Sequence, residues 1–292
     1  GKMNDAFEYY GHNSIVTSYR NSKNFGSNSI SGFGSVYFAI GCIIESRART
    51  VLNCSTRIQG TGYVFPKEVV DDEWKYVSLT EDWEFTTDQI LQDRKIYYCD
   101  EAVFYDEQPT SFKVVWRQRL RWQKGHFLVS FSRLPELIRN IFKPKSKNRF
   151  SKFDFVTNIS PITLIISGLT ILQVIFLFLS PLFGYSLNEA FFGVNEDVNI
   201  LINIVFPRGF FISFLRNIII GYLGILFVSI ASFIINRNRI KNLSIFKKAL
   251  CCILSPFQYF FQFVIDIVAL FSKSTKWIEI KHENQNNISN LE

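Results

Sequence analysis

The sequence predicts an α/β layered domain followed by a transmembrane helical region. Up to residue 149, short β-branched and aromatic runs alternate with stretches of helical spacing, and charges are scattered throughout. From residue 150 on, the chain is rich in Phe, Ile and Leu, and its charges gather in short clusters between long apolar runs. Alternating strands and helices are typical of α/β layers, whereas long apolar runs are typical of membrane spans.

The elements of the first half are bounded by Gly, Pro and polar residues. Its predicted strands are residues 14–19, 63–65 and 95–98, the second of which ends at Pro66. A polar loop is expected after the first strand, at residues 20–26. The predicted helices are residues 29–49, 82–91 and 112–141, the last as one or two amphipathic helices that lead to the membrane.

Three apolar runs of the second half are candidates to cross a bilayer. Residues 159–185 and 217–236 carry no charged side chain, and a spanning helix needs about 20 residues. Residues 249–272 contain a single charge, Asp266, and are interrupted by Pro256. This third run can span, kink or lie as a re-entrant or interfacial segment, and Asp266 is either a functional group inside the membrane or a residue near its surface.

The net charge of +7 is concentrated beside the apolar runs. Basic clusters occupy residues 133–152 and 237–248, whereas the loop at 186–216 has more acidic than basic residues. This pattern follows the positive-inside rule, argues against nucleic acid as a partner and favours membrane lipids. We therefore predict a multi-pass protein of the cell (plasma) membrane with a cytoplasmic N-terminal half.

Cysteine and histidine positions favour neither a metal site nor a disulfide framework. The five cysteines have no CxxC spacing, which fits a reducing, cytosolic environment. The three histidines are far apart in the sequence and are interpreted as surface or packing residues.

The acidic cluster at residues 80–84 is the first candidate for chemistry. Glu81, Asp82 and Glu84 stand where a loop gives way to a helix, and Thr80 can act as the N-cap. Acidic residues in a first turn complement the helix dipole, so this pattern alone is more typical of helix capping than of catalysis.

Gln118, Arg121 and Trp122 form the second candidate, because their spacing places them on one helix face. One interpretation is an interface helix whose Trp and Arg lie at headgroup level. The other is a sugar-nucleotide site, where Arg binds pyrophosphate oxygens and Trp offers a flat face to a pyranose.

Four motifs follow one another along the chain: Gln59-Gly60-Thr61-Gly62, Leu79-Thr80-Glu81-Asp82, Tyr105-Asp106-Glu107-Gln108-Pro109 and Gln118-Arg119-Leu120-Arg121-Trp122. In this order they resemble the motifs of processive family 2 glycosyltransferases, the group of the cellulose, chitin, hyaluronan and poly-N-acetylglucosamine synthases. The resemblance covers residues 2–125 and continues through the apolar helices in layout only. It implies a GT-A (nucleotide-diphospho-sugar transferase) domain, of which residues 1–130 are the C-terminal half.

The resemblance also implies roles for these residues. Asp82 would be the catalytic base of an inverting displacement, with Thr80 and Glu81 beside it at the substrate. Gln118, Arg121 and Trp122 would bind the pyrophosphate and the acceptor sugar, and Gly60, Thr61 and Gly62 would lie near the acceptor. The donor would be a UDP-sugar, with glucose or N-acetylglucosamine as the leading candidates, and the acceptor a growing polysaccharide, another glycan or a lipid-linked glycan.

One family feature is missing. The family holds Mg²⁺ or Mn²⁺ with an Asp-x-Asp motif, which this sequence lacks. Asp71-Asp72 follows the glycine loop instead of preceding it, and is not that motif. We therefore expect an N-terminally truncated chain that does not turn over substrate alone.

Beyond that domain, we expect a basic amphipathic membrane-interface segment at residues 131–152. A transmembrane region of two or three helices is expected at 153–275, and a polar tail at 276–292. Two alternatives to the transferase remain open. A glycosidase would need a second acid, for which Glu81, Glu84 and Glu107 are candidates. A degenerate membrane scaffold or partner subunit of a polysaccharide synthase would keep the fold without catalysis.

Overall fold

A computed structural model describes most of the chain. The described residues are 1–71, 73–162, 164, 165, 168, 169, 172, 175, 179, 182, 210–240 and 243–272, with only the backbone at 210–215 and 258–260. The chain divides into two compact units, one formed by Gly1–Pro161 with Ser229–Glu292 and the other by Ile162–Val228. The architecture below is that of the first unit.

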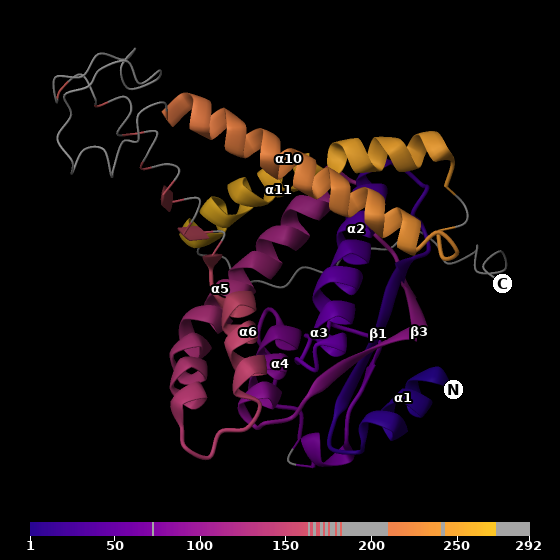
Figure 1. Cartoon of the computed structure of the whole chain (residues 1–292), viewed down its shortest axis with the longest axis vertical. Coiled ribbons are helices and arrows are strands. Elements are labelled where there is room, and N and C mark those ends of the chain that lie inside the picture. Colours follow the sequence, from indigo (N-terminus) through magenta and orange to yellow (C-terminus); the bar gives the residue numbers. More distant parts are fainter. Residues whose placement is uncertain are drawn as a thin grey trace. The chain divides into compact units, whose positions relative to one another are not determined.

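A three-stranded sheet lies at the centre of this unit (Figure 1). β1 (Ile15–Ser22) is its middle strand, antiparallel to β2 (Tyr63–Val64) and parallel to β3 (Ile96–Asp106). The β1–β3 register shifts between Ser18 and Tyr19, so that three residues of β3 bulge out. All three predicted strands are confirmed in position.

Two strands are longer than predicted. Residues 20–22, expected in a loop, continue β1 because they pair with residues 104–106 of β3. β3 runs to Asp106 instead of ending at residue 98, since the bulge places polar residues in the strand without ending the pairing.

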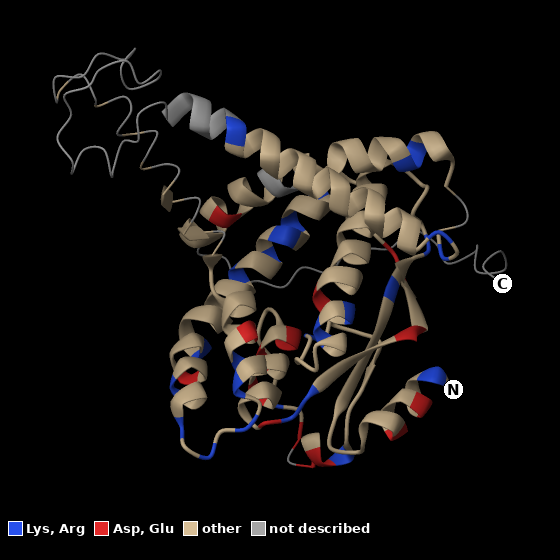
Figure 2. Cartoon of the chain, in the orientation of Figure 1, with Lys and Arg blue, Asp and Glu red and all other residues tan. Residues whose placement is uncertain are grey.

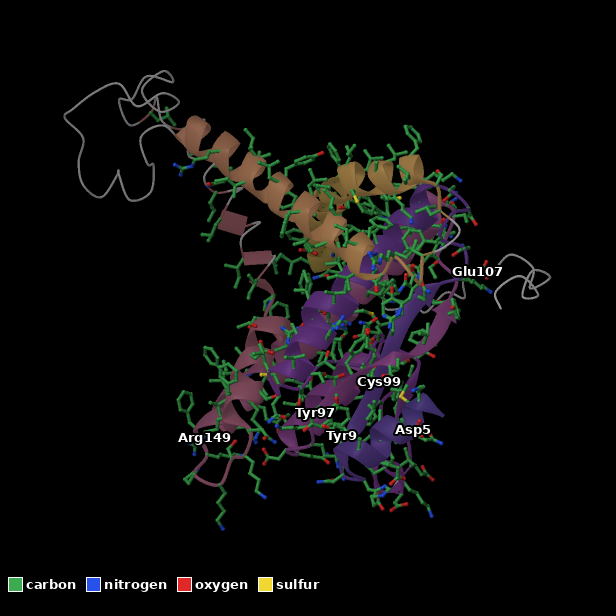
Figure 3. The ribbon with its side chains drawn as sticks, turned by 45° about the vertical axis from the view of Figure 1, so that its right-hand side comes forward. Asp5, Tyr9, Tyr97, Cys99, Glu107 and Arg149 are labelled. Atoms are coloured by element: carbon green, nitrogen blue, oxygen red, sulfur yellow. The ribbon has the colours of Figure 1, made fainter. Side chains whose placement is uncertain are left out.

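The two faces of β3 contact different helices. Tyr97 stacks on Tyr10 of α1 (Lys2–Tyr10), with ring centres 4.0 Å apart. Figure 3 shows Tyr97 and Cys99 beside this helix. Ile96 and Tyr98, which alternate with them, are buried toward the remaining helices.

Those remaining helices form the opposite layer. α2 (Ser29–Ile40) begins at an Asn28–Ser31 capping box and continues without a break through the π-helical segment η1 (Gly41–Arg47) into α3 (Ala48–Val51). α4 (Glu81–Leu91), α5 (Phe112–Phe142) and α6 (Arg149–Ile159) pack around one core. A short 3-10 helix, η2 (Lys67–Val69), follows β2. The predicted helices are confirmed, and the longest is a single helix of 31 residues. The shared core contains Ile15, Ile58, Tyr76, Phe85, Ile90, Ile96, Val129, Leu137, Phe155 and Ile159.

Two apolar helices follow in the chain. α10 (Phe210–Ile235) contains a candidate span at Arg216–Ile235, which agrees with the predicted run at 217–236. α11 (Ile245–Phe271) contains Pro256, and its parts Ile245–Phe257 and Phe261–Phe271 are bent by 43°, so it counts as a third candidate only if the bent pair is one span. Figure 2 shows few charges along either helix.

Ser29–Val51 also has the length and composition of a membrane span. The sequence had placed it in the first half as an ordinary helix, and its contacts fit that assignment. Cys42 packs on the sheet residues Tyr19 and Tyr98, and Arg49 forms an ion pair with Asp154 of α6. Most of the predicted span at 159–185, the loop at 186–209 and the tail from 273 lie outside the described residues.

The segment from α10 into α11 is fixed to the α/β layers. Arg239 donates two hydrogen bonds to the Asp100 carboxylate, each of 3.0 Å, at the bulge of β3. On α11, Gln262 donates to Gln123 of α5 at 3.0 Å and to Asp266 at 2.9 Å. Asp266 is fully buried, so it is an interior residue of this unit and not an exposed one.

Candidate active site

The glycine loop before β2 has a backbone that only glycine tolerates easily. Gly60 and Gly62 have φ of 82° and 66°. A Cβ on Gly62 would lie 2.2 Å from a ring carbon of Phe104 and 2.6 Å from the Ser18 hydroxyl. Ser18 accordingly donates to the Gly62 carbonyl at 2.7 Å. The loop is therefore fixed to the sheet, with Gly60 and Thr61 exposed at its tip.

Asp82 lies beneath this loop in the first turn of α4. Its Oδ1 accepts the Trp83 backbone N–H at 2.9 Å, while its Oδ2 is 3.9 Å from the position of a Cβ on Gly60. One carboxylate oxygen is thus held by the helix end and the other faces the glycine loop. Glu81 and Glu84 share the same turn.

Thr80 is the N-cap of α4, as the sequence predicted, but its hydroxyl does not cap the helix. Its carbonyl accepts the N–H groups of Trp83 and Glu84 at 3.1 and 3.2 Å. The side chain instead packs on α5, where a Cβ on Gly125 would lie 2.5 Å from the Thr80 methyl. The capping interpretation of Thr80 is therefore wrong for its side chain, because the space is taken by a helix–helix contact.

Arg121 joins the two predicted motifs directly. Its Nη1 donates to the Leu79 carbonyl at 2.8 Å, immediately before Thr80. Gln118, from the same motif, is half-buried, and its side chain makes no hydrogen bond within the described part of the chain. α5 thus approaches the start of α4 through Arg121 and Gly125, 42 and 45 positions after residues they meet.

Trp122 points toward α2. Its ring and that of Phe38 are arranged edge to face, with centres 6.0 Å apart. The Arg119 guanidinium lies 5.6 Å from the Trp122 ring centre and 4.1 Å from that of Tyr37. The indole is therefore held from two sides while remaining half-buried, which agrees better with a site wall than with a headgroup anchor.

Burial dominates the electrostatics of this turn. It raises the pKa of the Asp82 carboxyl, and Glu81 adds to the rise, while Arg57, the Trp83 N–H and Arg20 act in the opposite direction. Burial also lowers the pKa of Arg121, against the attraction of Glu81 and Asp82. The carboxylate is thus a stronger base than a solvated Asp, surrounded by cations that keep it ionisable.

Sequence reasoning did not select Arg20 and Arg57. Arg20 lies on β1, where its Nε donates to Asp106 at 2.8 Å and its Nη1 to the Gln59 carbonyl at 3.0 Å. It thereby connects the glycine loop to the end of β3. Arg57 is paired with Glu45 at 3.2 Å. Asp106 did belong to a quoted motif, but neither arginine has a local signal beyond its position near a strand or the glycine loop.

His126 was interpreted as a surface or packing residue, and the structure places it against the site. Its ring centre is 4.5 Å from that of Trp83. Burial, together with Arg57, lowers its pKa to about 4. The imidazole is therefore neutral at physiological pH.

The described residues contain no group of three His, Cys, Asp or Glu side chains that could hold a metal ion. The divalent cation implied by the resemblance has no donor set there, and no step is derived through it. The proposed second acid of a glycosidase is also unsupported at Glu107, because this carboxylate, at the end of β3 (Figure 3), pairs with Lys23 at 2.8 Å.

Part of the chain is similar to a known protein family. Residues 11–125 match the family model described as glycosyltransferase like family 2. No curated protein matches the chain. The matched stretch contains the glycine loop, the start of α4 and the Arg121–Trp122 face, and thereby supports glycosyl transfer as the activity of this region.

Proposed function

We propose that the chain carries part of a membrane-bound, inverting glycosyltransferase in which Asp82 is the general base. The sugar, glucose or N-acetylglucosamine, would move from a UDP-sugar to a growing polysaccharide or another glycan acceptor. The observation that carries the proposal is the divided environment of Asp82. One oxygen is fixed by the Trp83 N–H, and the other faces the glycine loop at 3.9 Å from the Cβ position of Gly60.

Inverting transfer needs one base and no covalent intermediate. Asp82 accepts the proton of an acceptor hydroxyl while that oxygen attacks the anomeric carbon and the bond to the nucleoside diphosphate breaks. Burial raises the pKa of the Asp82 carboxyl, which strengthens it as a base. The family match at residues 11–125 supports this chemistry in general, and the base assignment is the proposal's own.

Arg121 and Trp122 are proposed to bind the two ends of the reacting pair. Arg121 donates one N–H to the Leu79 carbonyl. Its remaining N–H groups are proposed to donate hydrogen bonds to the diphosphate oxygens as negative charge builds on them. The half-buried indole of Trp122 is proposed to stack on the acceptor sugar, with Gln118 beside it. Thr80, Glu81 and the Gly60–Thr61–Gly62 loop would complete the acceptor side.

Membrane attachment is proposed from the two apolar helices and the α5–α6 turn. α10 and α11 would cross the cell membrane, with the α/β layers in the cytoplasm. Residues 131–152 combine exposed apolar and basic side chains and would contact anionic headgroups. The exposed members are Phe131, Ile138, Arg139, Phe142, Lys143, Lys145, Lys147, Arg149 and Phe150.

The base assignment is tested by Asp82→Asn in the complete protein in native membranes. Loss of general-base catalysis should lower sugar transfer by at least about 100-fold while UDP-sugar binding is retained. Glu84→Gln, in the same helical turn, is the matched control and should keep near-normal transfer. Near-normal turnover of Asp82→Asn would exclude this residue as the base.

The acceptor assignment is tested by Trp122→Ala. Its expected effect is a raised KM for the acceptor with donor binding unchanged. A panel of UDP-sugars, with sizing of the product, identifies the donor and decides whether the enzyme makes a polymer. If Trp122→Ala changes only the amount of protein inserted in membranes, the indole is a headgroup anchor.

A further inference from the structure

Arg57 packs against Trp83, the residue that follows the proposed base in the chain. It belongs to the segment between α3 and the glycine loop, two residues before Gln59. Its side chain is 12% exposed, and its Nε donates to Glu45 of η1 at 3.2 Å. A guanidinium in such a place needs compensating partners, because an unpaired buried charge is strongly unfavourable.

The second partner of Arg57 is the residue next to the base. Its guanidinium carbon is 4.9 Å from the centre of the Trp83 ring. The backbone N–H of Trp83 is the group that holds Asp82 Oδ1 at 2.9 Å. Arg57 therefore reaches the base in two ways, through the orientation of Trp83 and through its charge, which attracts the carboxylate.

His126 packs on the same indole and is uncharged, so Arg57 is the cation at this ring. Its ring centre is 4.5 Å from that of Trp83, and its pKa of about 4 keeps it neutral. A protonated imidazole here would add a positive charge beside the guanidinium, which the burial of both groups disfavours. The indole of Trp83 thus contacts one permanent cation, Arg57, and two neutral rings, those of His126 and Phe155.

Every layer around Asp82 contributes a charged or titratable group. Glu81 adjoins it on α4, and Tyr63 faces it from β2. The cations come from three elements and act in the same direction on the carboxylate. They are Arg20 on β1, Arg57 before the glycine loop and Arg121 on α5. Arg57 is the strongest of the charges that favour the ionised carboxylate, and Glu81 opposes it.

We infer that Arg57 is a positioning residue for the base: held by Glu45 and seated on Trp83, it keeps Asp82 ionised and oriented toward the glycine loop. This inference rests on the proposed role of Asp82. Its physical basis is that a carboxylate removed from water stays charged only with a nearby opposite charge. The same guanidinium is paired with Glu45 and lies over Trp83, so the ion pair serves the site as well as the fold.

The pH dependence of transfer separates this role from a purely structural one. Without Arg57 the pKa of Asp82 rises further, so the base is protonated at a higher pH. Arg57→Gln in the complete protein should therefore move the acid limb of kcat/KM to higher pH. Transfer at pH 6 should fall about tenfold relative to the parent protein, and the gap should narrow toward pH 8.5.

Two further variants make the prediction specific. Arg57→Lys keeps the positive charge and should restore the acid limb toward that of the parent protein. Glu45→Gln leaves the guanidinium charge less neutralised and should not move the limb upward. A mere loss of packing would affect Arg57→Gln and Glu45→Gln alike, and would not move the acid limb of kcat/KM in one of them alone. Arg49→Gln is the matched control, because Arg49 is a similarly buried ion-pair partner, with Asp154 at 2.6 Å, and faces α6 instead of the site.

The outcomes are distinguishable from failure of the proposed function. A loss of transfer in Arg57→Gln that is equal at all pH values, with no rescue by Arg57→Lys, would overturn the inference. An unchanged pH profile would overturn it as well. In either case an inactive Asp82→Asn protein would still support Asp82 as the base. An active Asp82→Asn protein would exclude both the base role of Asp82 and the positioning role of Arg57. Melting temperatures of all variants identify any that fail to fold.

Discussion

Two charged side chains, the buried Lys152 and the half-buried Asp82, have very different surroundings. Lys152 on α6 is 1% exposed, and its ammonium donates to Asp93 and Asn140 at 2.6 Å each and to Ser146 at 2.8 Å. Asp82 receives one hydrogen bond, from the Trp83 N–H, and within the described residues no donor reaches its Oδ2. Each N–H group of the Lys152 ammonium thus has an acceptor, whereas one oxygen of Asp82 accepts no hydrogen bond from the described residues.

The difference indicates which charge maintains the fold and which is available for chemistry. A Lys ammonium has three N–H groups, and those of Lys152 have three acceptors around the turn between α5 and α6. Adding a substrate there would break an existing bond. At Asp82 an incoming hydroxyl can donate to Oδ2, which accepts no hydrogen bond from the part of the chain that the structure describes. Saturation of a buried charge is therefore typical of structure, and a single open oxygen is typical of a base.

The largest expected effect is that of Lys152→Met. The substitution leaves the Asp93 carboxylate without its buried cation and the turn without its central donor. We expect the α/β unit to lose about 3 kcal/mol of stability, measured by thermal unfolding in detergent micelles. Lys147→Met, an exposed lysine of the same turn, is the control and should change stability little. If Lys152→Met unfolds like the parent protein, saturation does not mark a structural charge here.

The contact between α4 and α5 gives the next effect in size. A Cβ on Gly125 would lie 2.5 Å from the Thr80 methyl and 2.6 Å from its hydroxyl. Gly125→Ala should therefore cost about 2 kcal/mol and displace the start of α4, lowering transfer as well. Thr80→Ala removes both colliding atoms, so the double variant should recover part of the stability. Equal losses with and without Thr80→Ala would mean that this contact does not fix the base.

The sequence predicted the elements of the α/β unit because their signals are local. Strand and helix positions follow from periodicity and from Gly and Pro at their ends. The place of Asp82 at a helix start made it a candidate, and its role as the base was predicted from the resemblance of four ordered motifs to family 2 glycosyltransferases. The end of β3 was missed because polar residues interrupt its pattern at the bulge. The strand pairs with β1 on both sides of the bulge, and Asp100 within it is held by Arg239, far away in the chain. Composition likewise cannot separate Ser29–Val51 from a membrane span, since its ion pairs form only in the folded unit.

The neighbours of Asp82 were not predictable for the same reason. Arg57, Arg20 and His126 come from three different segments and meet at α4 only through tertiary packing. Thr80 illustrates the opposite error, in which a local signal predicts a contact that the fold does not form. Its side chain packs against α5 and does not accept a backbone N–H of α4. Predicting such contacts requires the relative placement of α4 and α5, which spacing along one helix does not contain.

The smallest expected effect has the opposite sign and is the sharpest test of the comparison. Burial raises the pKa of Asp82, so the folded protein binds its proton more tightly than the unfolded chain does. The stability that this group contributes is therefore present below its unfolded pKa and is lost as pH rises through its folded pKa. At neutral pH the charged carboxylate of Asp82 therefore lowers the stability of the fold. Removing this charge does not leave Arg57 unpaired, because Arg57 still forms its ion pair with Glu45.

At pH 7.5 the free energy of unfolding of Asp82→Asn should consequently exceed that of the parent protein by less than about 1 kcal/mol, although we expect the variant to be inactive. Its unfolding temperature should be slightly higher. The gain should shrink as the pH is lowered toward 4, where the carboxyl of the parent protein becomes neutral. Differential scanning calorimetry at the two pH values measures both quantities, with Glu84→Gln as the control from the same turn. A destabilised Asp82→Asn protein would place Asp82 with Lys152, as a charge that the fold requires.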